Sequence, residues 1–283
     1  MVMKKSIEEL EKIASQVRRD IVRMVHGCQS GHPGGSLGCA DFLTALYIEI
    51  MDYKLPFSMN GNDEDLFFLS NGHISPLWYS VLSRSGFFDV AELKTFRKIN
   101  SRLQGHPTTH EELPGIRVAS GSLGQGLSVA CGAALTKKMN KDNKTVFILT
   151  GDGELQEGQN WEALMFAAHH KLDNLLITVD YNGQQIDGST KKVMDLGDLK
   201  AKFESFGLIV LELNGNKMNE VVEGLNKAKS LLGAGAPVAI LMKTIMGYGV
   251  DFMMTGHEWH GIAPNDTQLQ RALEQLPLTL ADY

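Results

Sequence analysis

The sequence predicts an α/β fold in which a parallel sheet is covered by helices on both faces. After residue 144, short apolar runs that indicate strands alternate with longer polar and apolar segments that indicate helices. No internal repeat and no linker rich in Pro, Gly and Ser interrupts the 283 residues. We therefore expect residues 1–283 to form a single domain with a large core.

The first third of the chain is expected to be mostly helical. Residues 6–28 carry apolar side chains at helical spacing and predict the first helix. The glycine-rich segment 30–35 ends it, and a second helix is expected from Leu37 to about Met51. Leu66–Leu69 then predicts a short buried strand.

The rest of the chain predicts the remaining sheet. Strands are expected at residues 146–149, 175–179, 208–213 and 238–242. Helices are expected at residues 154–171, 196–206 and 219–232, with a short helical cap at about 264–283. Since ligands bind at the carboxyl ends of parallel strands, the polar segments at residues 70–73, 150–153, 180–183 and 243–247 are the first candidates for a site.

Charge and cysteine content exclude several classes of function. The formal net charge of −6 argues against nucleic acid and anionic membranes as partners and favours a small molecule. The three cysteines form no Cys-x-x-Cys pair, which argues against a disulfide framework and favours a reducing, cytoplasmic location. Neither a signal peptide nor a membrane span is predicted.

Two segments at one expected edge of the sheet suggest a metal and diphosphate site. Asp152 lies between Gly151 and Gly153 after one strand, and Asn182 follows the next. Carboxylate and amide oxygens suit Mg²⁺ or Ca²⁺, and glycines let backbone approach a diphosphate near a helix N-terminus. Each motif alone could be an ordinary turn. Their placement after consecutive strands favours a site.

These two motifs resemble the thiamine diphosphate (TPP) motif, in which Gly-Asp-Gly is followed about thirty residues later by Asn. Further segments resemble transketolase motifs in transketolase order: Ser30-Gly31-His32-Pro33-Gly34, Leu69-Ser70-Asn71-Gly72-His73, Gly105-His106-Pro107, Gly121-Ser122-Leu123-Gly124-Gln125-Gly126, Ile186-Asp187-Gly188, Lys243-Thr244 and His260-Gly261. The resemblance extends from about Ser30 to Pro264. It implies the diphosphate-domain fold of TPP enzymes.

The resemblance also implies the cofactor site. Asp152, Asn182 and the backbone carbonyl of Gln184 would bind Mg²⁺, with Ca²⁺ or Mn²⁺ as alternatives. The Gly153 amide would contact the diphosphate, and backbone groups of residues 121–123 would contact the pyrimidine ring. Many transketolases have Pro where this chain has Ser122. The cofactor-binding residues expected from the resemblance are His73, Gly121, Ser122, Leu123, Gly151, Asp152, Gly153, Glu157, Asn182, Ile186, Lys243 and His257.

Four histidines are the expected catalytic residues, because the resemblance places them along the funnel to the reactive carbon of TPP. They are His32, His73, His106 and His260. Histidine can exchange a proton near neutral pH and can hydrogen-bond sugar hydroxyls. A zinc pair formed by His257 and His260 is the alternative, although no third ligand cluster supports it.

The resemblance further implies that the chain works with a second polypeptide. The pyrimidine-binding domain of transketolases, with its activating glutamate, does not occur in residues 1–283. We expect a C-terminal transketolase subunit in an α2β2 heterotetramer, moving a two-carbon ketol unit between sugar phosphates of pentose phosphate metabolism. Glu157 is expected either to favour a helix N-terminus or to reach a subunit interface. The start at Met1 favours a natural split subunit over a fragment.

Two other functions stay open at this point. The chain could be a subunit of a different TPP enzyme, similar to deoxyxylulose-phosphate synthase or to a dehydrogenase. It could also be a non-catalytic module that binds TPP and metal. Activity with pyruvate would favour the former, and lack of ketol transfer with a correct partner would favour the latter.

Overall fold

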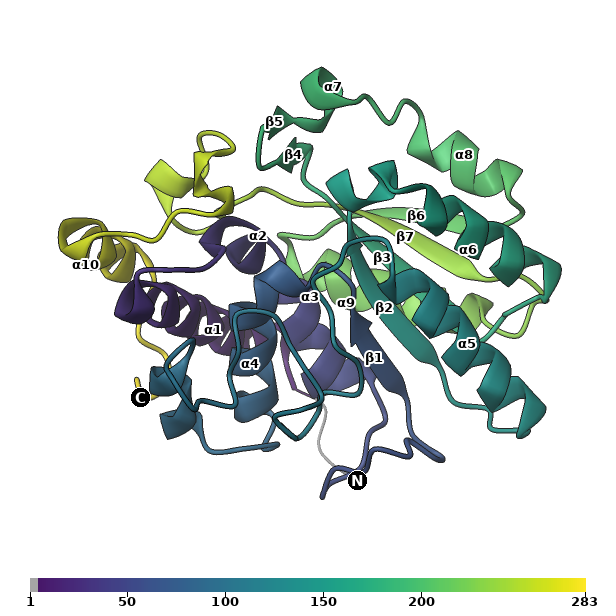
Figure 1. Cartoon of the computed structure of the whole chain (residues 1–283), viewed down its shortest axis with the longest axis horizontal. Coiled ribbons are helices and arrows are strands. Elements are labelled where there is room, and N and C mark those ends of the chain that lie inside the picture. Colours follow the sequence, from purple (N-terminus) through teal and green to yellow (C-terminus); the bar gives the residue numbers. More distant parts are fainter. Residues whose placement is uncertain (1–4) are drawn as a thin grey trace.

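A five-stranded parallel sheet lies at the centre of the computed structural model, which describes residues 5–283 (Figure 1). The first four residues of the expected domain lie outside the described residues. The strand order is β1-β2-β3-β7-β6, with bounds β1 Leu66–Leu69, β2 Val146–Gly151, β3 Leu175–Tyr181, β6 Ile209–Asn214 and β7 Val238–Lys243. All the pairings in this sheet are parallel. The expected fold class and all five expected strands are confirmed.

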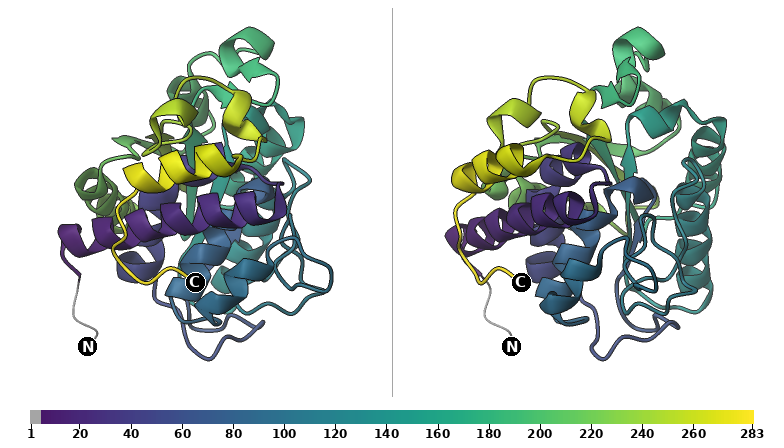
Figure 2. Two further views of the ribbon diagram at one scale, coloured as in Figure 1. Left: turned by 90° about the vertical axis from the view of Figure 1, so that its left-hand side faces the viewer. Right: turned by 60° about the vertical axis from the view of Figure 1, so that its left-hand side comes forward.

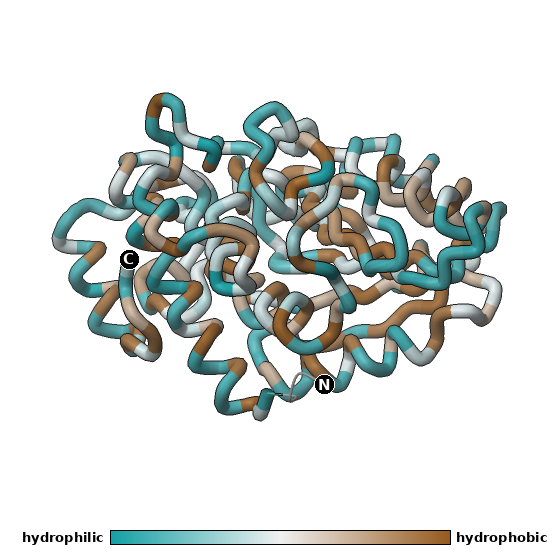
Figure 3. Tube along the Cα trace, turned by 90° about the horizontal axis from the view of Figure 1, so that it is seen from below, coloured by the Kyte–Doolittle hydropathy of each residue, from teal (hydrophilic) through white to brown (hydrophobic). Residues whose placement is uncertain are grey.

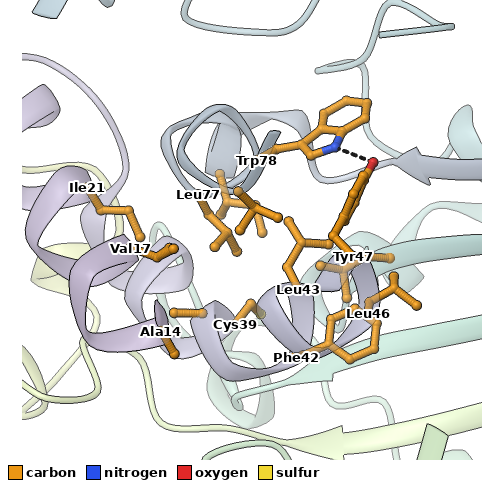
Figure 4. Close-up of a cluster of buried hydrophobic side chains, with 14 of the residues drawn as sticks. Ala14, Val17, Ile21, Cys39, Phe42, Leu43, Leu46, Tyr47, Leu77 and Trp78 are labelled. Carbon is orange, nitrogen blue, oxygen red and sulfur yellow. Dashed lines mark hydrogen bonds between the residues drawn. The ribbon is translucent and has the colours of Figure 1, made fainter. Parts of the chain in front are cut away.

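One face of the sheet is covered by a thick helical layer. It contains α1 (Ile7–Cys28), α3 (Ala40–Ala45), α4 (Ser75–Arg84) and α9 (Met218–Leu231). Ser6 and Glu9 form a capping box at the start of α1, which satisfies backbone N–H groups there. Figure 4 shows the core of this layer, where the Trp78 indole N–H donates to the Tyr47 hydroxyl at 2.8 Å.

The other face is covered by α5 (Gly126–Met139), α6 (Gly158–His169) and α8 (Leu199–Ser205), over a second apolar core. The central strands are buried between the two cores, which explains their nearly continuous apolar sequence. Apolar segments accordingly lie in the interior of Figure 3, with polar segments around them. No helix within residues 5–283 is long and apolar enough to cross a membrane.

The prediction of one helix from Leu37 to Met51 is wrong in its start and in its continuity. Helix α2 (Pro33–Gly38) already begins at Pro33, a residue suited to the first turn of a helix. The path then breaks at Cys39, whose φ and ψ are −95° and 7°, before α3 and the π-turn η1 (Leu46–Ile50). Gly38 packs against the backbone of Ile245, where an added Cβ would lie 2.9 Å from the carbonyl oxygen. The break thus lies where this segment packs against the loop after β7.

The expected helix at residues 154–171 also begins later than predicted. A 3-10 turn, η4 (Gly153–Gln156), comes first, and Glu157 is extended with ψ of 124° before α6 starts. A two-stranded hairpin, β4 (Gln184–Gln185) and β5 (Gly188–Ser189), and the short helix α7 (Thr190–Val193) follow β3. The extended Glu157 separates the N-terminal amides of α6 from the Gly-Asp-Gly turn.

The C-terminal segment packs along α1, as the two views of Figure 2 show. Helix α10 (Asp266–Gln275) has a capping box between Asn265 and Gln268. The expected cap at 264–283 is therefore helical only in its first half. The residues after it lie against α1, where the Arg19 guanidinium donates to Leu276 O at 2.7 Å and to Asp282 Oδ2 at 2.8 Å.

Candidate functional site

A cavity of about 210 Å³ lies at the carboxyl ends of β2, β3 and β7. Its walls come from the loops after these strands and after β1, together with α2 and the β4–β5 hairpin. The lining residues are Gly35, Asn71, His73, Leu123, Gly151, Asp152, Gly153, Glu154, Gln156, Glu157, Asp180, Asn182, Gln184, Gln185, Ile186, Met246 and His260. The edge of the sheet that the sequence singles out therefore contains a real cavity.

Asp152 is the centre of the polar wall. Its side chain is 1% exposed and accepts hydrogen bonds from the backbone N–H groups of Gly153 at 2.8 Å and Gly183 at 2.6 Å. Burial, then the neighbouring Asp180 carboxylate, raise the pKa of Asp152 to about 7. The ionised form therefore needs a stabilising cation that the surrounding protein does not supply.

Asn182 lies beside this carboxylate and is held in a fixed orientation. Its amide nitrogen donates to Asp180 Oδ2 at 2.9 Å, and its Oδ1 accepts from the Gln184 N–H at 2.8 Å. The second oxygen of Asp180 accepts from the Thr244 hydroxyl. Asn182 and Gln184 both line the cavity with Asp152, so the three expected metal ligands come together.

Three buried carboxylates gather at this edge without a cationic partner. Asp152, Glu154 and Asp180 are each at most 2% exposed, and burial is the first cause that raises the pKa of each. Within residues 5–283, none of the three makes an ion pair with Lys, Arg or His. A buried charge of this kind is costly unless a cation joins it.

The residues present fit a divalent metal and a diphosphate. The donors are hard oxygens, which suit Mg²⁺. No group of three or more His, Cys, Asp and Glu in residues 5–283 could hold a metal, so such a site must also use amide, carbonyl or ligand oxygens. The buried Asn71 Oδ1, at the cavity wall, has no hydrogen-bond partner. It is a polar atom that a bound group or its water could satisfy.

The four expected catalytic histidines form one cluster. The ring centroid of His32 lies 5.1 Å from His73, 6.3 Å from His106 and 5.5 Å from His260. The rings of His73 and His260 are 5.0 Å apart. Four segments that are distant in the sequence thus present imidazoles to one place.

Burial keeps these imidazoles uncharged. It is the first cause that lowers the pKa of His32 to about 4, with the nearby His260, Arg97 and His106 adding to it. Burial also lowers the pKa of His73, His106 and His260. Neutral rings can both accept and donate hydrogen bonds near pH 7, which suits contacts with sugar hydroxyls.

The two histidines of the alternative zinc pair do not lie on an α-helix. His257 and His260 lie in and beside the 3-10 turn η6 (Glu258–His260), so their rings are not presented one above the other on an α-helical face. His257 does not line the cavity, although it is close enough to His260 to lower that residue's pKa.

The other expected cofactor residues differ in how close they lie to the cavity. Leu123, Gly151, Gly153, Glu157 and Ile186 line it. Gly121, at φ of 129°, packs against the ring of His106, and Ser122 is exposed. Neither Gly121 nor Ser122 lines the cavity.

Lys243 is not brought into the cavity. Its ammonium group lies 3.3 Å from the Glu212 carboxylate, and its side chain is 64% exposed. Met246, three residues later in the same segment, lines the cavity instead. The polar wall residues that the sequence did not predict are Asn71, Glu154, Gln156, Asp180 and Gln185. Each is a polar residue inside or close to one of the segments that were predicted to form the site.

Comparison with known proteins agrees with this geometry. Residues 10–279 match the family described as "Transketolase, thiamine diphosphate binding domain". One of the subunits of the apulose-4-phosphate transketolase of Actinobacillus succinogenes is 37% identical over 272 residues, which cover 96% of this chain and 97% of that protein. The 6-deoxy-6-sulfo-D-fructose transketolase subunit SqwG of a Clostridium species is 36% identical over 244 residues, which cover 86% and 87%.

A solved structure gives the same result. Transketolase from Campylobacter jejuni superposes with a TM-score of 0.88 at 32% sequence identity. The match covers 96% of this chain and 43% of that one, so the chain spans less than half of that transketolase. The chain belongs to the transketolase family, as its thiamine diphosphate binding domain.

Proposed function

We propose that this chain is the TPP- and Mg²⁺-binding subunit of a two-chain transketolase. The complex would transfer a two-carbon ketol unit from a ketose phosphate to an aldose phosphate. The observation that carries this proposal is the meeting of two features at one cavity. Asp152 and Asn182 line it with hard oxygen atoms, and a cluster of neutral histidines lies beside them.

In this proposal the residues around Asp152 and the four histidines have different roles. Asp152, Asn182 and the Gln184 carbonyl would hold the metal, and Gly153 would contact the diphosphate through its amide. When bound, TPP supplies the stabilisation of carbanions. His32, His73, His106 and His260 would hydrogen-bond the sugar hydroxyls and hold or release the proton of the reacting hydroxyl.

The partner would be a separate C-terminal subunit that carries the pyrimidine-binding domain. Two observations support this. The chain matches nearly the full length of a relative named as one subunit of a transketolase, yet only 43% of the Campylobacter jejuni transketolase chain. Exposed apolar side chains also occur in the segments that bear the cavity or flank it, namely Ile186, Val193, Met194, Ile245 and Ile262. An α2β2 assembly in the cytoplasm is part of this proposal.

Purification of the chain under native conditions from its own cells tests the proposal. We expect a stoichiometric partner to co-purify and the complex to transfer ketol units in the presence of TPP and Mg²⁺. Activity with pyruvate as donor would instead identify a different TPP enzyme. Binding of TPP without any transfer, in a complex with its stoichiometric partner, would identify a non-catalytic module.

A further inference from the structure

The side chain of Glu154 connects three separate loops of the site. Its Oε1 accepts from the Gly124 N–H at 2.8 Å and from the Ser70 hydroxyl. Its Oε2 accepts from the Gly151 N–H at 3.1 Å. We propose that Glu154 is a positioning residue that fixes these loops relative to one another in the arrangement that binds TPP. The proposal rests on the proposed function above.

Each of the three donors lies in a loop that carries a predicted site residue. Ser70 begins the loop that carries His73, and Gly151 immediately precedes Asp152. Gly124 immediately follows Leu123. One carboxylate therefore joins the loop of the histidine cluster, the loop of the metal ligand and the loop expected to contact the pyrimidine ring.

The loop around Gly124 has few other bonds to hold it. Outside helices, the described backbone bonds of residues 119–125 run from Ser120 N to Pro107 O at 3.1 Å, from Gln125 N to Ser122 O at 3.4 Å and from Val129 N to Gln125 O at 3.4 Å. The side-chain amides of Gln125 and Gln159 also bond to each other. The loop also passes very close to Ser70, since a Cβ added to Gly126 would lie 2.4 Å from the Ser70 Oγ. A bond from Glu154 at this point therefore controls how close the loop comes to β1.

The buried side chain of Glu154 is surrounded by hydrogen-bond donors. The residue is 2% exposed, and all three of its side-chain partners are donors, two of which are backbone N–H groups that cannot accept. Its own backbone carbonyl accepts from the Asn160 amide at 2.7 Å, which holds Glu154 to α6.

The conservative substitution Glu154→Gln breaks this arrangement without changing its size. The glutamine side chain has one acceptor oxygen and one NH2 donor. If the oxygen faces Gly124, the NH2 group faces the N–H of Gly151. In the flipped orientation it faces the N–H of Gly124. One backbone N–H is thus left without an acceptor in either orientation.

The test uses the complex of this chain with its partner, and TPP at fixed Mg²⁺ as the probe. We expect Glu154→Gln to weaken TPP affinity about tenfold and to speed amide hydrogen exchange at Gly124 or Gly151 before any cofactor is added. Glu204→Gln, on the exposed face of α8, is the matched control and should change neither. Ser70→Ala, which keeps the Glu154 carboxyl group and both backbone donors, should give a smaller, severalfold loss.

The outcomes separate this inference from the proposed function. If the wild-type complex binds no TPP, the proposed function fails and the positioning role fails with it. If Glu154→Gln lowers only the melting temperature and leaves TPP affinity and exchange unchanged, Glu154 merely stabilises the fold and the inference is wrong. Should that variant not assemble, Ser70→Ala decides, since an unchanged affinity there would contradict the proposal.

Discussion

Buried carboxylates are treated differently in the two halves of this molecule. In the helical layer around α1 and at the amino ends of the strands, each has a cationic partner. Asp41 lies 2.6 Å from the Arg18 guanidinium, Asp20 lies 2.9 Å from that of Arg84, and Glu64 lies 2.7 Å from that of Arg117. At the carboxyl ends of the strands, Asp152, Glu154 and Asp180 are equally buried but have only neutral donors.

This difference separates structural charges from functional ones. An ion pair satisfies a buried carboxylate within the chain itself and leaves no unmatched charge for a ligand. A carboxylate without a cation keeps an unmatched negative charge that a metal ion can stabilise. The same burial that would weaken the fold thus prepares the site for a cation.

The largest effect is expected from removing the unmatched charge at the centre of the site. Asp152→Ala should abolish Mg²⁺-dependent TPP binding, a loss of at least about a hundredfold, because a metal ligand is lost. Calorimetric titration of the complex with TPP at fixed Mg²⁺ measures this loss. Glu223→Ala, on an exposed part of α9, serves as the control. Equal TPP affinity in the two variants would contradict the assignment of the metal site.

The two classes of carboxylate should respond oppositely to neutralisation in the absence of metal. Asp20→Asn leaves the Arg84 guanidinium, whose side chain is 10% exposed, without its partner, and should lower the free energy of unfolding by about 3 kcal/mol. Asp152→Asn should leave the free energy of unfolding unchanged or raise it at pH 8. The reason is that a pKa raised to about 7 makes the ionised Asp152 unfavourable in the folded state above that pH.

Urea unfolding of both variants at pH 8, with a chelator present, compares them directly. At pH 5 the advantage of Asp152→Asn should shrink, because folded Asp152 is then largely protonated. Equal destabilisation by both substitutions would remove the distinction between the two classes.

The histidine cluster offers a contrast within the site itself, because it contributes no charge. His106→Ala should spare TPP affinity and slow ketol transfer by roughly tenfold to a hundredfold, since a group that donates or accepts one proton or hydrogen bond is lost. Steady-state assays of the complex at saturating TPP would show the lower kcat. If the variant instead needs a higher TPP concentration to reach an unchanged kcat, His106 acts in cofactor binding.

The smallest effect is expected for the partly exposed ion pair between Arg19 and Asp282. A hydrogen bond from Arg19 is the first cause that lowers the pKa of Asp282 to about 2. Because this pKa lies below the unfolded value, the pair stabilises the fold above about pH 4, and this contribution is lost as the pH falls toward 2. Asp282→Asn should cost about 1 kcal/mol near neutral pH after allowing for solvent screening.

Unfolding curves of wild type and Asp282→Asn between pH 7 and pH 2.5 provide the measurement. The difference between the two proteins should shrink steadily below pH 4. A difference that stays constant down to pH 2.5 would show that the hydrogen bonds of Asp282, and not its charge, hold the C-terminal segment.

The sequence predicted most of the sheet because strands buried on both faces are short, continuous apolar runs. The bounds of β1 were predicted as observed, and the other four strands differ by at most two residues at either end. Helices α4 and α5 were not predicted. Nine of the ten residues of α4 are buried, so no polar face marks its periodicity. Gly124, Gly126 and Gly132, with several alanines, obscure α5 similarly.

The site was predictable as far as motifs define it. Asp152, Asn182 and the four histidines were found because glycines mark their loops, and the structure brings them together. Glu154 and Asp180 were missed because their role depends on which loops meet in space. Lys243 was expected at the cofactor site for the same reason, but it pairs with Glu212 on the neighbouring strand β6. Spacing along a strand does not show which neighbour a side chain will find.

The strand order described above has a consequence for how the protein is made on the ribosome. Among the described residues 5–283, strand β6 pairs only with β7, and β7 lies between β3 and β6 although it comes last of these strands in the sequence. During synthesis, β6 therefore has no partner strand until residue 243 has left the exit tunnel. The exposed edge of β3 must likewise stay open for the late strand, a state prone to wrong pairing. Insertion of β7 closes the gap and completes the cofactor edge as the last step of sheet assembly.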